Sequence, residues 1–235
     1  TLDNKNKDFF FFEKKDVRSV MGALVYLVKT RLPEYIGASP FEIQVLTPMR
    51  KGELGVEHLN EVLQYYLNPA SESKKEKEGR TGVFREGDKV MQVKNNYKLE
   101  WKITNAKGFS IEEGLGVFNG DMGIIKQINT YSERITVVFD ENREAEYPFS
   151  SLDELELAYA ITIHKSQGSE YPAVVLPLLS GPPILCNRNL LYTAITRAQK
   201  CVAIAGRQSM VEQMIHNETE QKRYSGLNDC LKEGL

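Results

Sequence analysis

The stretch LAYAITIHKSQGSEYP, Leu157 to Pro172, puts a histidine, a lysine, a glutamine, a glycine, a glutamate and three small hydroxyl residues between two apolar runs. The second run is AVVLPL, Ala173–Leu178, and the helical pattern RNLLYTAITRAQ and the apolar run CVAIAG follow it. Short apolar runs that alternate with helical patterns are typical of βα units. This alternation predicts a parallel sheet with right-handed crossovers, with the polar residues on a loop-helix between two strands.

The same alternation occurs upstream. Asp16 can cap a helix whose apolar stripe covers residues 17–28, and Pro33 is expected to end that helix. The run FEIQVL, Phe41–Leu46, has the length of a strand, and the spacing of apolar residues over 56–67 predicts a second amphipathic helix. These elements and the C-terminal part of the chain therefore form one α/β layer.

A different pattern separates the two halves of this layer. Residues 68–80 are polar and mixed in charge, which predicts a solvated loop. Short β-type runs follow, among them GDKVMQVKNNY and GVFNGDMGIIKQI, and RITVVFDENREAEYPF predicts a hairpin with its turn near Asp140. Short strands at this spacing suggest a small barrel. We therefore expect the α/β layer at residues 1–82 and 151–235 and an inserted β domain at residues 83–150.

Composition limits the classes of protein that fit. Thirty basic and 32 acidic residues nearly cancel, so binding to nucleic acid would need a local patch. Cys186, Cys201 and Cys230 have no zinc-ligand spacing, which favours buried thiols in a reducing cytosol. No segment has the length of a membrane span, so we expect a cytoplasmic protein without a membrane partner. The start at Thr1 instead of a methionine suggests a piece of a longer chain.

Three polar segments are expected at the carboxyl ends of the strands, where parallel α/β sheets bind ligands: TPMRKG, TIHKSQGSE and, on a helix, YTAITRAQ. Hydroxyl groups, helix N-termini and arginine forks are typical partners of phosphate. Each residue also has a structural explanation when it is taken alone. Thr47 could end a strand, His164 could be a structural histidine, Glu170 a charge at a helix end, and Arg197 a surface ion pair beside a buried stripe.

Several other catalytic patterns are absent from the sequence. There is no G-x-x-x-x-G-K-[ST] loop, and no acidic pair follows an apolar strand in the way a Walker B segment requires, since Asp140 and Glu141 lie near the predicted hairpin turn. No Ser/His/Asp set, metal cluster or Rossmann glycine set replaces them. The chain therefore has side chains suited to binding phosphate, but its sequence contains no phosphate-binding loop.

These segments resemble motifs of superfamily-one helicases. LAYAITIHKSQGSEYPAVVLPL resembles motif V, LLYTAITRAQKCVAIAG resembles motif VI, and IQVLTPMRKGELGVEHLNEVLQ resembles motif IVa. GDKVMQVKNNY and GVFNGDMGII are similar to the RecD-like branch. The resemblance implies a RecA-like, P-loop NTPase-type parallel sheet, the second motor domain without Walker A, with an inserted SH3-like β-barrel.

The resemblance also implies roles for individual residues. Arg197 would be catalytic and reach the γ-phosphate of ATP, and Gly168 and Glu170 would contact the nucleotide. Arg50 would also bind ATP, although it could serve the DNA strand instead. The residues that would contact DNA are Thr47, Thr162, His164, Lys165 and Asn119. Asn119 could instead form a turn, and the possible stacking residues Tyr97, Trp101 and Phe118 could instead pack in the core. The motif IV arginine has no clear counterpart, and no residue is assigned to a metal.

The function implied is the C-terminal half of an ATP-dependent DNA helicase, similar to the alpha subunit of exodeoxyribonuclease V. It would move 5′ to 3′ on single-stranded DNA in recombination and repair. ATP with Mg²⁺ would be bound mainly by a first motor domain upstream in the same parent chain, so this part alone would be inactive. Two alternatives stay open: a binding module for nucleic acid or protein that does not use ATP, and the helicase half of a conjugative relaxase.

Overall fold

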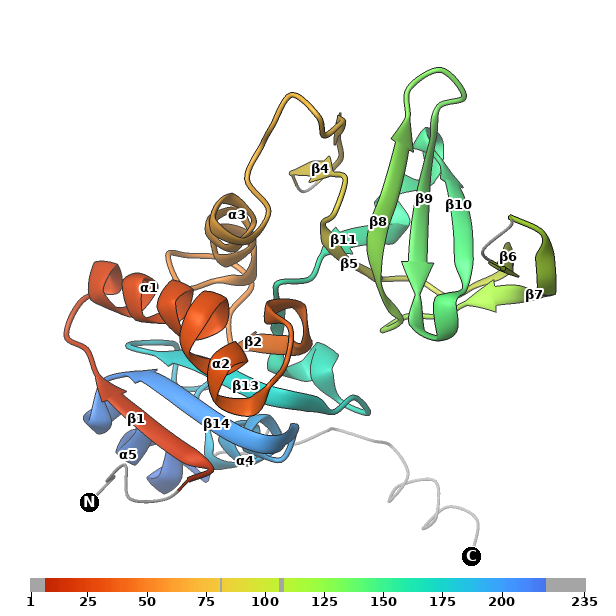
Figure 1. Cartoon of the computed structure of the whole chain (residues 1–235). Helices are drawn as coiled ribbons and strands as arrows, with labels where there is room; N and C mark the ends of the chain where they lie inside the picture. The colour runs from red at the N-terminus through yellow and green to blue at the C-terminus, as the bar shows by residue number, and fades with distance from the viewer. Residues whose placement is uncertain (1–6, 81, 106–107, 219–235) are drawn as a thin grey trace, which may run out of the picture.

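A computed structural model describes residues 7–80, 82–105 and 108–218 of the chain. One part of it is a parallel sheet of five strands in the order β1-β14-β13-β2-β12 (Figure 1). These strands are β1 (Phe9–Glu13), β2 (Ile43–Thr47), β12 (Ala160–Thr162), β13 (Tyr171–Leu178) and β14 (Ala198–Gly206). The predicted α/β class with a parallel sheet is confirmed. The strand β1 was not expected, because four phenylalanines between charged residues show no alternation.

Helices cover both faces of this sheet. α1 (Val17–Tyr26), α2 (Leu32–Ile36) and α3 (Val56–Leu67) lie on one side, and α4 (Arg188–Ile195) and α5 (Gln208–His216) lie on the other (Figure 1). Neighbouring residues of a strand point to opposite faces. Accordingly, Val45 of β2 packs in one core cluster with Leu24 and Leu59, and Leu46 packs in the other with Met214.

The first helical run continues past Pro33. Asp16 caps α1 as predicted, since its carboxylate accepts a hydrogen bond of 2.9 Å from the amide of Ser19. The prediction that Pro33 ends the helix is wrong. A π-helical turn, Leu27–Arg31, comes first, and Pro33 then occupies the first turn of α2, a position that tolerates proline. The run ends at Gly37, whose φ of +66° suits glycine.

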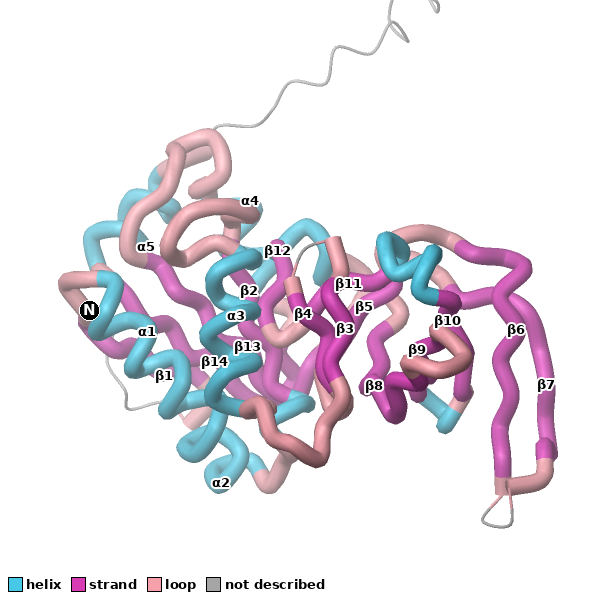
Figure 2. The backbone as a smooth tube through the Cα atoms, turned by 90° about the horizontal axis from the view of Figure 1, so that it is seen from above, coloured by secondary structure: helices cyan, strands magenta, loops and turns pink. Residues whose placement is uncertain are grey.

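The insert is an antiparallel sheet of seven strands in the order β11-β5-β8-β9-β10-β6-β7. The strands are β5 (Lys89–Gln92), β6 (Asn96–Thr104), β7 (Ser110–Val117), β8 (Met122–Asn129), β9 (Arg134–Phe139), β10 (Glu144–Pro148) and β11 (Leu155–Leu157). The predicted hairpin is β9–β10. Because β11 pairs with β5, the sheet continues past the boundary expected at residue 150. Figure 2 shows the β6–β7 pair as the part of the insert farthest from the parallel sheet.

One further detail of the fold differs from expectation. The polar segment 68–80 contains β3 (Glu76–Glu78), which pairs with β4 (Val83–Arg85). Cys186 and Cys201 are buried, whereas Cys230 lies outside the described residues. None of the helices described between residues 7 and 218 is long and apolar enough to cross a membrane.

Two adjacent residues fix the insert to the parallel sheet. The carboxylate of Asp88 accepts hydrogen bonds from Gln64 and Asn68 of the α3 region and from the hydroxyl of Tyr159. The ammonium of Lys89 donates to the carbonyl oxygen of Phe41 at 2.7 Å and to Gln44 Oε1 at 2.8 Å. Burial raises the pKa of Asp88 and lowers that of Lys89 to about 7.

Candidate functional site

The residues predicted to contact ligands lie at two opposite ends of the parallel sheet. Gly168, Ser169, Glu170 and Arg197 come just before β13 and β14, so they lie at the amino ends of these strands; we call them the amino-edge group. The carboxyl-edge group follows β2 and β12 or ends them: Thr47, Arg50, Thr162, His164 and Lys165. The expectation that all three polar segments meet at the carboxyl ends is therefore wrong.

Arg197 also has a different local setting from the one predicted. α4 ends at Ile195 and β14 begins at Ala198, so Arg197 lies in the turn between them and not on the helix. The apolar spacing continues to Ala198, but pairing of Ala198 with Tyr171 of β13 extends the strand instead. The partner strand thus overrides the local helical pattern.

The guanidinium of Arg197 is only partly engaged. One terminal nitrogen donates to the carbonyl oxygen of Ser169 at 3.2 Å, and its own carbonyl accepts a 2.8 Å hydrogen bond from the amide of Tyr171. Its Nε is buried and has no hydrogen-bond partner among the described residues. A buried donor without a partner is costly, so a shift of this side chain that brings Nε to an acceptor is favoured.

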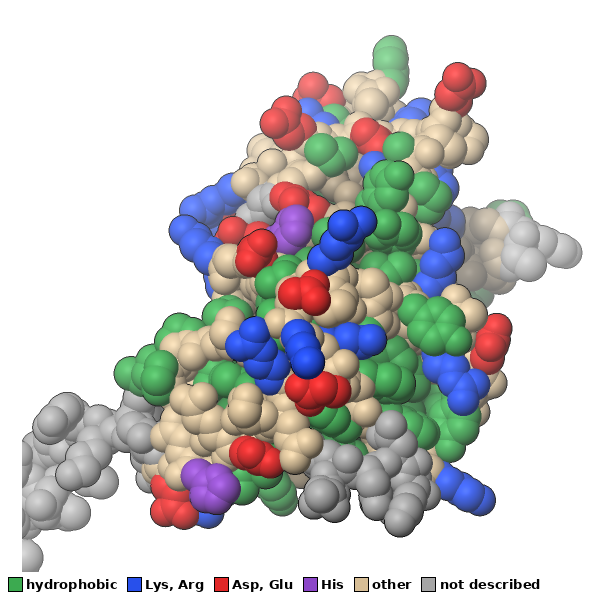
Figure 3. Space-filling model, turned by 90° about the vertical axis from the view of Figure 1, so that its left-hand side faces the viewer, with side chains coloured by type: hydrophobic (Ala, Val, Ile, Leu, Met, Phe, Trp, Pro, Cys, Tyr) green, Lys and Arg blue, Asp and Glu red, His purple; other side chains and the backbone are tan. Residues whose placement is uncertain are grey.

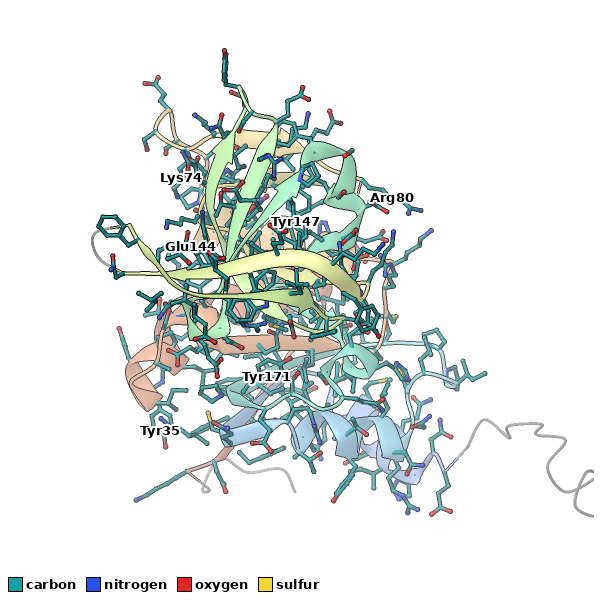
Figure 4. The ribbon with its side chains drawn as sticks, turned by 90° about the vertical axis from the view of Figure 1, so that its right-hand side faces the viewer. Tyr35, Lys74, Arg80, Glu144, Tyr147 and Tyr171 are labelled. Atoms are coloured by element: carbon teal, nitrogen blue, oxygen red, sulfur yellow. The ribbon has the colours of Figure 1, made fainter. Side chains whose placement is uncertain are left out.

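The rest of the amino-edge group borders a hollow. Gly168 is exposed with a φ of +90°, and the exposed carboxylate of Glu170 accepts a 3.2 Å hydrogen bond from Gln199. Ser169, Glu170 and Tyr171 line a hollow of about 560 Å³ between the parallel sheet and the insert. Figure 4 shows Tyr171 on the side of the sheet that faces the insert. Burial raises the pKa of the Tyr171 hydroxyl.

Thr47 is fully buried at the carboxyl end of β2. Its hydroxyl donates to the carbonyl oxygen of Leu54 at 2.7 Å and accepts a 3.3 Å hydrogen bond from the amide of Met49. It thereby shapes the loop that presents Arg50. Contact between Thr47 and DNA stays a prediction.

A short 3₁₀ turn, Ile163–Ser166, carries the other carboxyl-edge residues. The hydroxyl of Thr162 accepts a hydrogen bond of 3.3 Å from the amide of Lys165 and so caps this turn. His164 is exposed beside it. The segment 163–170 then crosses from the carboxyl end of β12 to the amino end of β13. It therefore joins the two groups through one short piece of backbone.

Glu156 of β11 brings two of these cations together. Its Oε1 lies 2.6 Å from a terminal nitrogen of Arg50, and its Oε2 lies 2.8 Å from Nζ of Lys165. Burial alone would raise the pKa of Glu156, but the hydrogen bonds from Lys165 and Arg50 outweigh it and lower the pKa. Arg50 thus lies beside Lys165 and not in the amino-edge group, although it was predicted to bind nucleotide. Sequence reasoning missed Glu156, because 106 positions separate it from Arg50.

The insert presents an exposed polar and aromatic group. The amide of Asn119 donates to Asn95 Oδ1 at 2.9 Å, and Asn95 Nδ2 lies 3.3 Å from the hydroxyl of Tyr97. Tyr97 and Phe118 pack edge to face with ring centroids 5.6 Å apart and are 68% and 42% exposed. Core packing therefore does not account for either ring. Trp101 is half-buried, and its ring covers Gly114.

Charge is mixed over the face of the molecule in Figure 3, where basic and acidic side chains lie side by side. This agrees with the formal net charge of −2. Within the described part of the chain, no three His, Cys, Asp or Glu side chains gather in a way that could hold a metal ion.

The five-stranded parallel sheet with its β insert is the architecture expected of a helicase C-terminal domain that carries an SH3-like insert. Residues 59–139 match the family model of the ATP-dependent RecD-like DNA helicase SH3 domain, and residues 157–205 match that of the UvrD-like helicase C-terminal domain. The chain belongs to the RecD-like helicase family.

Individual relatives agree with these matches. The chain is 39% identical over 167 residues to the ATP-dependent RecD2 DNA helicase of Deinococcus radiodurans, which covers 71% of this chain and 20% of that protein. It is 30% identical over 191 residues to the RecBCD enzyme subunit RecD of Mycolicibacterium smegmatis, which covers 81% of this chain and 29% of that protein. The chain thus spans less than a third of the length of either relative.

Among solved structures, a Pif1 helicase from Bacteroides in complex with ADP-AlF3 and single-stranded DNA is similar. The match has a TM-score of 0.44 and 17% identity and covers 92% of this chain and 53% of that one.

Proposed function

We propose that this chain acts as the second motor domain of an ATP-dependent DNA helicase that moves 5′ to 3′ along single-stranded DNA in recombination or repair. One observation carries the proposal: the buried, unpartnered Nε of Arg197 at the amino edge of the sheet. An arginine in this state is suited to a phosphate oxygen that arrives across a cleft between two domains.

Arg197 would act on charge that develops during phosphoryl transfer. The carbonyl of Ser169 orients the guanidinium through one terminal nitrogen, and Nε remains for the ligand. Mg²⁺ bound with ATP would neutralise charge on the phosphate oxygens, and we propose that its ligands lie in a first motor domain of the parent protein. Loss of a stabilising arginine of this kind costs roughly a thousandfold in turnover.

The carboxyl-edge group would hold the backbone of the DNA strand through Lys165 and Arg50, with His164 and Thr162 beside them. Asn119, Tyr97 and Phe118 would continue this surface onto the insert. Because segment 163–170 touches both edges, a shift of the turn at Lys165 would be transmitted to Ser169. Such a link drives movement only if the open and closed states differ in affinity for the strand.

The test is ATP hydrolysis stimulated by single-stranded DNA, in the parent protein with its first motor domain. Arg197→Ala is expected to lower turnover roughly a thousandfold while a fluorescent ATP analogue still binds. Arg188→Ala is the matched control, because Arg188 lies at the start of α4 and pairs with the exposed Glu218 at 2.7 Å. Normal turnover in Arg197→Ala would remove the assignment.

A second candidate is a module that binds nucleic acid without ATP. The exposed Tyr97–Phe118 pair favours it, because stacking on aromatic rings needs no nucleotide. The parent protein would then bind single-stranded DNA equally well with and without ATP analogues and would not hydrolyse ATP. A nucleotide-dependent change in DNA affinity rejects this candidate.

A further inference from the structure

The carboxylate of Glu156 occupies the two cations that the proposed DNA site would use. One oxygen lies 2.6 Å from Arg50 and the other 2.8 Å from Lys165, so both acceptor atoms are engaged by charged donors. The side chain of Glu156 is 20% exposed, whereas those of Arg50 and Lys165 are 47% and 29% exposed. Glu156 is therefore the least exposed of the three side chains.

The three residues come from three separate elements. Glu156 belongs to β11 of the insert, Arg50 to the loop after β2, and Lys165 to the turn after β12. The backbone of Glu156 is held in register with Met91 of β5. Because a paired strand is stiffer than a loop or a single turn, the cations and not the carboxylate are the partners that can move.

The site offers no net positive charge in this state. Arg50 and Lys165 contribute two positive charges, and Glu156 together with Glu57, 3.6 Å from Nε of Arg50, contributes two negative charges. A phosphodiester that approached this set would gain little Coulomb energy from it. Guanidinium and ammonium groups bind phosphate and carboxylate oxygens through the same donors, so the two anions compete.

The space between these side chains is also closed. Arg50, Glu156, Thr162 and Lys165 border a cavity of only about 10 Å³. A cavity of this size holds about one water molecule. A phosphate group therefore cannot enter the space between Glu156 and the two cations, and it takes over the donors that face Glu156 only after the loop and the turn part from that carboxylate.

We propose that Glu156 is an internal substitute for a backbone phosphate of the DNA strand, which exchanges places with it on Arg50 and Lys165. This inference rests on the proposed function, because it assumes that the carboxyl-edge group contacts DNA. In the free protein Glu156 ties the insert to both loops. When the strand binds, the cations transfer to its phosphates, and the affinity for DNA is set by the cost of breaking these two ion pairs.

The experiment measures binding of a fluorescein-labelled oligothymidylate to the chain by fluorescence anisotropy over a series of KCl concentrations. Glu156→Gln is expected to bind about tenfold more tightly than the unchanged chain, because two partly buried ion pairs no longer oppose binding. The slope of affinity against salt should stay the same, since the same phosphates are contacted in both proteins. Glu53→Gln, on the same loop as Arg50, is the matched control and should change affinity by less than about twofold.

A double-mutant cycle distinguishes the exchange of Glu156 for a phosphate from a general effect of removing a negative charge. In the background Arg50→Ala/Lys165→Ala, Glu156→Gln should have no effect, because the pairs that it removes no longer exist. Glu156→Asp keeps the charge on a shorter side chain, so its gain in DNA affinity should lie between those of the unchanged chain and Glu156→Gln. This variant tests the proposal if Glu156→Gln does not fold. A melting curve by circular dichroism checks folding of each variant.

Three results would overturn the exchange. Weaker binding by Glu156→Gln would mean that the carboxylate organises the cations instead of competing. Tighter binding with a slope steeper by about 1.4 would mean that two additional phosphates are contacted only when Glu156 is removed. An equal gain in DNA affinity in Glu53→Gln would mean that only the change in net charge strengthens binding. Failure of the DNA site itself has a separate signature: Arg50→Ala/Lys165→Ala would bind the oligonucleotide as well as the unchanged chain.

Discussion

At the amino edge of the parallel sheet, Arg197 keeps a buried Nε that has no partner among the described residues, whereas at the carboxyl edge Arg50 and Lys165 both end on Glu156. The first arrangement stores an unused donor, and the second holds its donors in internal ion pairs. A ligand at the amino edge would add a hydrogen bond, whereas a ligand that takes the donors facing Glu156 at the carboxyl edge would replace one. Affinity for the two ligands should therefore respond differently to mutation.

The largest effect is expected where the donor is unused. Arg197→Lys keeps the charge but removes Nε and the planar fork, so turnover of the parent protein should fall on the order of a hundredfold. Steady-state ATP hydrolysis with saturating single-stranded DNA measures this. Turnover that survives in the lysine variant would show that charge alone suffices at this edge, and the contrast with the carboxyl edge would weaken.

A smaller effect is expected where the insert extends the carboxyl edge. Replacing Tyr97 and Phe118 together by alanine should weaken binding of an oligothymidylate roughly tenfold, because a base that stacks on an aromatic ring gains about 1–3 kcal/mol. Tyr131→Ala is the control, since Tyr131 is 99% exposed at the tip of the β8–β9 hairpin. Equal losses in both proteins would mean that the Tyr97–Phe118 pair is not a specific platform.

The smallest effect concerns a third cation, Lys89, which is buried against neutral acceptors instead of a carboxylate. Burial lowers its pKa from 10.5 to about 7, with Asp140 and Glu42 opposing the shift. The unfolded chain therefore holds more protons between these two pH values, so the free energy of unfolding should rise with pH above about 7, by about 1 kcal/mol per pH unit.

Urea unfolding at several pH values between about 7 and 9 measures this slope. The pH range ends at about 9 because burial also raises the pKa values of the Cys186 and Cys201 thiols. At higher pH these thiols make the slope of the unfolding free energy against pH negative. Lys89→Met should flatten the slope. Lys126→Met, which removes an exposed lysine paired with Glu144, should leave it unchanged, and an unaltered slope in Lys89→Met would contradict the assignment.

Local sequence was enough for part of this architecture. The parallel sheet followed from runs such as Ala173–Leu178, which are apolar because helices cover both faces of the strand. The β9–β10 hairpin followed from its turn, where Glu141 and Asn142 take positive φ angles of 60° and 61°. Both patterns involve neighbours within a few residues, where spacing carries the information.

Long-range placement could not be predicted in this way. Arg197 left the helix because Ala198 pairs with Tyr171, and nothing within the helical pattern reports that partner. Alternation in LEL indicates that Glu156 points away from the buried Leu155 and Leu157, but not that it meets Arg50. Tyr97 and Phe118 were as compatible with a core as with a binding surface, yet Tyr97 near the start of β6 and Phe118 just after the edge strand β7 pack on each other and stay exposed.

The attachment of the insert has a mechanical consequence. Asp88 and Lys89 are consecutive, and their side chains are anchored in different directions, one toward the α3 region and the other toward β2. A joint held on two sides resists both bending and twisting. We therefore expect the insert to move together with the parallel sheet, so that a small rotation of that sheet becomes a larger displacement at the far end of the β6–β7 pair.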